Sequence, residues 1–253
     1  MTKSIWNKSF FAALGLAALA VTALHTGAFA ESASQRAKEK YKDDPSVMLG
    51  NLDGLDYRRT LFAPFGQKTL RLEAPQGMCF LDETNYTERQ LMDRVRDAIS
   101  EDLQQQLVAM FVDCLQLTGA ARTANGFVFD SGFFSWPVKP GEKVPPTLQE
   151  YLAQQKPMEE EAVKGMLDGY IELDIDDTPH ESAGGVAVGY NGIFESSHEK
   201  IHTVGVAGVT MLQGLPVILG VSHSAKKLQK DKEELYALVD KMLIQQVALN
   251  NVR

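Results

Sequence analysis

Long hydrophobic runs are scarce in this sequence. The one extended run, Phe10 to Ala23, is shorter than the roughly 20 residues that a membrane-spanning helix needs, and no later segment is long and apolar enough. Lys3 and Lys8 precede the run, and Ala28-Phe29-Ala30 supplies an A-x-A motif after it. This pattern predicts a cleavable signal peptide over residues 1–30 and a periplasmic protein with no membrane span. An uncleaved N-terminal anchor is the alternative.

Cysteine is also scarce, because only Cys79 and Cys114 occur. Neither directly follows the apolar run, which excludes lipid attachment to a new N-terminal cysteine. Two cysteines in one exported domain usually pair, so we predict a Cys79–Cys114 disulfide that stabilises the fold by roughly 3–4 kcal/mol. The alternatives are two buried thiols or a redox pair, although redox pairs are usually spaced C-x-x-C.

Basic residues are outnumbered, with 25 Lys and Arg against 33 Asp and Glu. Loss of Lys3 and Lys8 with the signal peptide would move the formal charge from −8 to −10. Nucleic acid and anionic lipid repel so acidic a chain, which argues against both as partners. An unidentified protein or small-molecule ligand remains as the partner, and the sequence does not set the oligomeric state.

Nucleotide-binding motifs are missing, since neither G-x-x-x-x-G-K-[ST] nor a strand-linked G-x-G-x-x-G occurs. One metal motif does occur: His198-Glu199-Lys200-Ile201-His202 matches H-E-x-x-H. On a helix, His198 and His202 would share a face and bind zinc, and Glu199 would activate the bound water. The segment is similar in this respect to the zincin metallopeptidases.

Three observations favour an accidental match. The residues after His202 are β-branched and Gly-rich, which favours a strand over 201–212. Lys200 is charged where zincins have an uncharged residue, and Gly208 stands where one subfamily has a third histidine. We therefore predict no catalytic residue and no metal or other cofactor, and keep a zinc metallopeptidase as the alternative.

The remaining pattern predicts one α+β domain at 48–253 after a polar lead-in at 31–47. Two capping boxes, Thr87 to Gln90 and Thr147 to Glu150, predict helix starts, and a closing amphipathic helix is predicted at 228–250. We expect an antiparallel or mixed sheet with packed helices, similar to an α/β/α sandwich. Extended segments are predicted at 70–81 with a turn at Pro75-Gln76-Gly77, and at 107–117, 127–138, 171–176, 186–194, 201–212 and 216–221. For 107–117 a continuation of the preceding helix is the alternative, because periodicity does not distinguish the two.

The last quarter of the chain resembles a known fold. An extended segment from Thr203-Val204-Gly205, a glycine turn, a returning strand at Pro216-Val217-Ile218-Leu219 and a closing helix to Leu249-Asn250 resemble the C-terminal half of the PsbP-like α/β/α fold. This resemblance implies a small accessory protein without catalytic activity, and it transfers no site residue. We therefore expect an exported, non-catalytic binding or accessory protein.

Overall fold

The computed structural model describes residues 56–103, 105–114, 130–155, 170–195, 200–224 and 228–251. The signal peptide and the polar lead-in lie outside the described residues. The α+β arrangement predicted from the sequence is confirmed. In chain order the described elements are η1 (Asp56–Arg59), β1 (Thr60–Phe65), β2 (Lys68–Glu73), β3 (Met78–Phe80), α4 (Tyr86–Leu103), β4 (Gln106–Asp113), β5 (Asp130–Trp136), α6 (Leu148–Gln154), β6 (Tyr170–Ile175), β7 (His180–Ser182), β8 (Gly185–Glu195), β9 (Lys200–Leu212), β10 (Leu215–Ser224) and α8 (Leu228–Asn250).

An eight-stranded antiparallel sheet forms the body of the molecule, with the strand order β3-β4-β5-β10-β9-β8-β6 and β7 also paired to β8. Strands β9 and β10 form the hairpin that the sequence predicts, and Leu212 pairs with Leu215. Gln213 and Gly214 both have positive φ, 51° and 76°. Two such residues fit the type I′ turn, whose twist matches that of the flanking strands.

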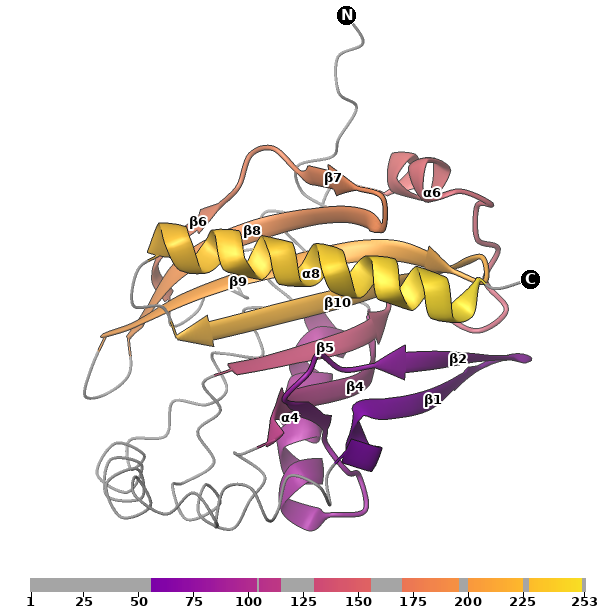
Figure 1. Cartoon of the computed structure of the whole chain (residues 1–253), viewed down its shortest axis with the longest axis horizontal. Helices are drawn as coiled ribbons and strands as arrows, with labels where there is room; N and C mark the ends of the chain where they lie inside the picture. Colours follow the sequence, from indigo (N-terminus) through magenta and orange to yellow (C-terminus); the bar gives the residue numbers. More distant parts are fainter. Residues whose placement is uncertain are drawn as a thin grey trace, which may run out of the picture.

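The long helix α8 covers one face of β8, β9 and β10 (Figure 1). A Cβ on Gly208 would lie 2.8 Å from Leu243 and 3.1 Å from Val239, so glycine lets the helix approach β9 closely. Leu235, Val239, Met242 and Leu243 are buried, as the helical period predicts. Figure 1 draws α4 behind β4 and β5, on the side of the sheet away from α8. The sheet therefore has a helix on each side.

The disulfide between Cys79 and Cys114 is present, which confirms that prediction. Cys79 lies in β3 and pairs in register with Val112 of β4, just before Cys114. The two Cα atoms are 5.0 Å apart, and the two cysteines are 0% and 5% exposed. The bond therefore links the short edge strand β3 to the end of β4. The disulfide itself is buried, so solvent scarcely reaches it.

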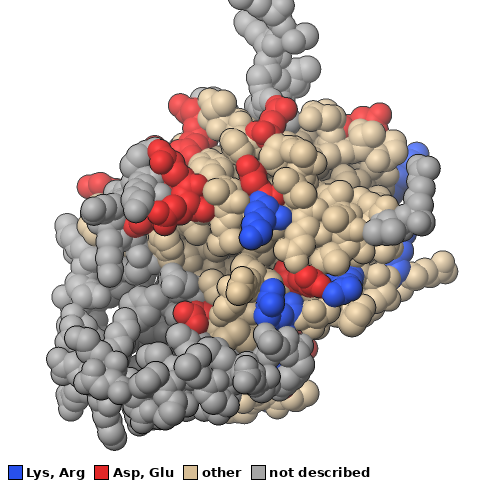
Figure 2. All heavy atoms as spheres, in the orientation of Figure 1, with Lys and Arg blue, Asp and Glu red and all other residues tan. Residues whose placement is uncertain are grey.

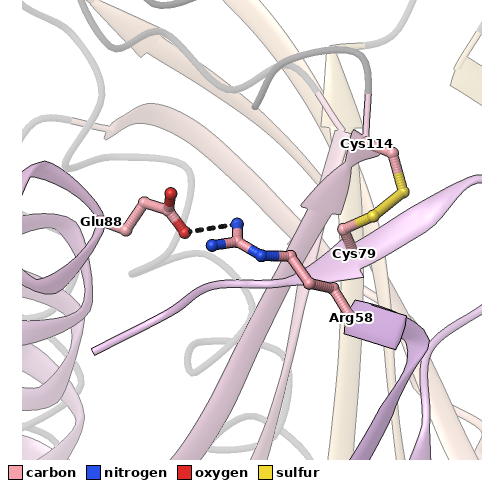
Figure 3. The surroundings of a disulfide bond; sticks show 4 residues. All are labelled: Arg58, Cys79, Glu88 and Cys114. Atoms are coloured by element: carbon pink, nitrogen blue, oxygen red, sulfur yellow. Dashed lines mark hydrogen bonds and ion pairs between the residues drawn. A yellow bond between two sulfur atoms is a disulfide. The ribbon is translucent and has the colours of Figure 1, made fainter. Parts of the chain in front are cut away.

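The start of α4 differs from the sequence prediction. The helix begins at Tyr86, not after Thr87, and the side chain of Asn85 accepts a hydrogen bond from the backbone N–H of Glu88 at 3.3 Å. The Glu88 carboxylate is buried and accepts from Arg58 at 3.0 Å (Figure 3). It also accepts from the Asp82 backbone N–H at 2.8 Å. Asn85 is as good a cap as threonine, and these contacts fix the earlier start. The second predicted cap is confirmed, because Thr147 accepts from the Glu150 N–H at 3.2 Å.

Two amide side chains of α8 fasten the β1–β2 hairpin to the rest of the fold. Asn250 accepts from the Arg71 N–H at 2.9 Å and donates to its carbonyl at 2.8 Å. Gln246 does the same at Glu73, at 3.2 and 2.9 Å. Four residues of a helix and two residues of a strand both span about 6 Å, so side chains at 246 and 250 are spaced to meet strand positions 73 and 71. The two amides thus make the backbone hydrogen bonds that a neighbouring strand would make.

Candidate functional site

A polar stripe on α8 faces strands β6 to β8. Lys232, Tyr236 and Asp240 are spaced four residues apart, so they lie on one side of the helix. They meet Asp176, which directly follows β6, and His180, which begins β7. We call these five residues the α8 network. It is the candidate functional site because it brings two carboxylates, a lysine, a tyrosine and a histidine together.

Asp176 is the centre of the network. Its Oδ1 accepts from the Lys232 ammonium at 2.6 Å, and its Oδ2 accepts from the Tyr236 hydroxyl at 2.7 Å. The Lys232 side chain is only 9% exposed, against 25% for Asp176. Among the described residues, Asp176 is the carboxylate that compensates the lysine charge.

Tyr236 acts as a neutral hydrogen-bond donor in the network. Burial raises the pKa of its hydroxyl well above the ordinary value, and the hydrogen bond to and negative charge of Asp176 raise it further. The hydroxyl consequently keeps its proton at physiological pH and stays bonded to the Asp176 carboxylate.

Gly189 makes room for these side chains. A Cβ at this position would lie 2.7 Å from Asp176 Oδ2 and 2.9 Å from carbon atoms of Lys232 and Tyr236. The Gly189 carbonyl also accepts from the Asp176 backbone N–H at 2.9 Å, which fixes the loop after β6. Strand β8 therefore needs glycine here for the network to close.

His180 is more exposed than the Asp240 carboxylate with which it pairs. The His180 Nε2 lies 2.7 Å from Asp240 Oδ2, and the two side chains are 48% and 23% exposed. The imidazole also contacts the Tyr236 ring, with 5.3 Å between ring centroids. A carboxylate that orients an imidazole can serve proton transfer or ligand binding, and here it also joins β7 to α8.

The H-E-x-x-H segment is described only at its end. Lys200, Ile201 and His202 belong to β9, which confirms the predicted strand over 201–212, and His202 is exposed. His198 and Glu199 lie outside the described residues, so the absence of a zinc site stays a prediction. No group of three or more His, Cys, Asp or Glu side chains within the described ranges could hold a metal ion.

His202 and His223 lie on the same face of the sheet. His223 of β10 pairs in register with Val204 of β9, two residues from His202. The His223 Nε2 is 3.9 Å from Asp231 Oδ2, near the start of α8. The structure thus places His223 next to an acid of α8, which the sequence argument had not singled out.

The spacing of Lys232, Tyr236 and Asp240 was a signal that the sequence analysis missed. Three polar residues four apart on an otherwise amphipathic helix indicate a polar stripe. Their partners Asp176 and His180 could not be found in this way, because they come from a different part of the sheet.

In the described part of the chain, no helix combines the length and apolar character that crossing a lipid bilayer requires. Comparisons with protein-family models, with curated proteins and with solved structures find no match to this chain.

Proposed function

We propose that this protein is an exported accessory protein of the periplasm that binds a partner and does not catalyse a reaction. The observation that carries the proposal is the use of Asp176, Lys232 and Tyr236 in the α8 network. Both oxygens of Asp176 accept hydrogen bonds, one from the Lys232 ammonium and one from the Tyr236 hydroxyl. Their arrangement holds α8 against the sheet, which favours a structural role for this trio.

The disulfide supports the export part of the proposal. Disulfides form and persist in oxidising compartments such as the bacterial periplasm. The Cys79–Cys114 bond is buried, as expected for a structural bond rather than one that exchanges with other thiols. Together with the predicted signal peptide at residues 1–30, it favours the periplasm over the cytoplasm.

The zinc content of the purified protein tests the function. An accessory protein is expected to contain only trace zinc by elemental analysis, and His198→Ala is expected to contain the same amount. Because the peptidase alternative needs His198 and His202 as metal ligands, it predicts one zinc per chain. That zinc would disappear in His198→Ala.

Glu199→Gln is the matched control for catalysis, because it removes the base and keeps both histidines. We expect wild type and Glu199→Gln to leave a casein substrate equally uncleaved. Stoichiometric zinc retained by Glu199→Gln, together with cleavage that this substitution abolishes, would replace our proposal with a metallopeptidase.

A further inference from the structure

The β1–β2 hairpin is a two-stranded ribbon outside the main sheet, and α8 bonds to one of its two edges. Within the described part of the chain, β1 pairs with β2 alone. Figure 1 draws β2 next to α8, with β1 on the far side of β2. Two amide side chains of α8 bond the backbone N–H and C=O groups of Arg71 and Glu73 in β2. The amides thus satisfy the β2 edge of the ribbon, and β1 forms the other edge.

The pairing register shows which backbone groups of β1 lie along this outer edge. In an antiparallel pair, two residues directly opposite each other either bond to one another or both point away. Arg71 and Glu73 point away from β1, so their partners Phe62 and Thr60 point away from β2. Each of the two presents a backbone N–H and a C=O at the edge. Pro64 follows in the same alternation and presents only its C=O, because proline has no N–H.

The outer edge of β1 is accessible. Phe62 is 65% exposed, and Pro64 is exposed as well. No hydrogen bond from another described residue reaches the outward backbone groups of Thr60 and Phe62. Unpaired N–H and C=O groups along an exposed edge are a template for a further strand, and the Phe62 ring beside them offers apolar contact. The chemistry of this edge therefore selects an extended backbone as its occupant.

Two uncompensated positive charges stand at the ends of β1. Arg59 directly precedes the strand, and Lys68 pairs in register with its last residue, Phe65. The Arg59 Nε is buried with no hydrogen-bond acceptor among the described residues, and Lys68 donates to the neutral Gln213 carbonyl. No described carboxylate forms an ion pair with either side chain. The other basic residues of η1 and β2 are compensated by acids, in the ion pairs Arg58–Asp82, Arg58–Glu88 and Arg71–Glu73.

The acidic side chains of the protein do not reach this edge. Figure 2 shows them gathered on the β6 side of the molecule, away from the hairpin. Strand β1 itself contains no charged residue. An occupant with acidic residues at its two ends would therefore compensate charges that the described part of the chain leaves without an acid.

We propose that β1 binds an extended segment of another protein, which adds a strand to the outer edge of the hairpin. The segment is apolar where it meets Phe62, and its acidic ends pair with Arg59 and Lys68. This inference rests on the proposed function, because it assigns the surface through which an accessory protein binds its partner. The β1 strand of a second copy fits this edge less well, since it has no acidic residue to offer.

NMR titration of the isotopically labelled protein with a synthetic peptide tests the proposal. The probe is the blocked peptide Glu-Val-Thr-Val-Thr-Val-Glu, and the control peptide has lysine at both ends instead. We expect the acidic probe to bind with a dissociation constant on the order of 100 micromolar, because few backbone hydrogen bonds form. It should shift the amide signals of Thr60 and Phe62 and slow their hydrogen exchange. The lysine peptide is expected to bind at least about tenfold more weakly.

Two substitutions at position 62 separate backbone pairing from side-chain contact. Phe62→Pro removes the outward N–H, whereas Phe62→Thr removes the ring and keeps the N–H. We expect Phe62→Pro to weaken binding of the acidic probe by at least about tenfold and Phe62→Thr by about threefold. The N–H at position 62 does not bond to β2, and edge strands tolerate proline, so both variants should fold. Thermal unfolding checks this, and Arg59→Gln, expected to weaken the acidic probe about fivefold, is an independent variant.

A wild type that does not bind the acidic probe at about 1 mM would overturn the proposal, as would equal binding of the lysine peptide. Binding by a folded Phe62→Pro protein as tight as that of wild type would also overturn it. Self-association of the protein without peptide, abolished by Phe62→Pro, would assign the edge to a second copy instead. Zinc content tests the accessory function separately, so loss of peptide binding and gain of a metal site are distinct outcomes.

Discussion

Replacing Asp176 with alanine is expected to lower the free energy of unfolding by about 2–4 kcal/mol, one of the two largest effects that the structure implies. The substitution removes the carboxylate that pairs with the Lys232 ammonium, and the Lys232 side chain is only 9% exposed. It also removes the acceptor of the Tyr236 hydroxyl. Urea unfolding followed by circular dichroism measures the change, provided that the slope m stays constant.

The matched variant is Lys232→Met, which removes the buried charge and keeps the length of the side chain. We expect it to cost less than Asp176→Ala, because Asp176 is 25% exposed and can turn to water. The double variant Asp176→Ala/Lys232→Met carries no lysine charge at this position. Its unfolding free energy should therefore exceed that of Asp176→Ala alone. Strictly additive losses would show that the two residues do not depend on each other.

Removing both cysteines is expected to be about as costly. For a sequence separation of 35 residues, the chain-entropy model gives roughly 3–4 kcal/mol for the variant Cys79→Ala/Cys114→Ala. The same unfolding measurement applies, and the double substitution avoids a free thiol that would complicate refolding. A loss below about 1 kcal/mol would mean that the bond adds little to the contacts between β3 and β4.

Reagent access gives an independent control for the disulfide. With the cysteines 0% and 5% exposed, a mild reductant should fail to open the bond in the folded protein and should open it in guanidinium. Rapid release of two thiols from the folded protein would contradict a buried structural bond.

The elements that the sequence predicts well are those defined by local patterns. Helix α8 follows from the apolar period of Leu235, Val239, Met242 and Leu243, which are all buried. The β9–β10 hairpin follows from its glycine turn, and the disulfide from the presence of only two cysteines. In each case the information lies within a few residues or in a single possible pairing.

The features that the sequence analysis missed depend on distant contacts. Strand β1 has Pro64 and only a short apolar alternation, and it is held by β2 and by Phe65 against Trp136. Gln246 and Asn250 read as ordinary polar helix residues, yet they bond to strand positions 173 and 179 residues away. No local pattern contains this information.

The intact mass of the protein recovered from the periplasmic fraction tests the central claim most directly, because it reports export and the disulfide together. We predict the mass of a chain from Glu31 to Arg253 less two hydrogens, with those hydrogens regained after unfolding and reduction. A chain that begins at Met1 and stays with the membrane fraction would contradict export. A mass that does not change on reduction would mean that the disulfide is absent. It would contradict the oxidising compartment on which the proposed function rests.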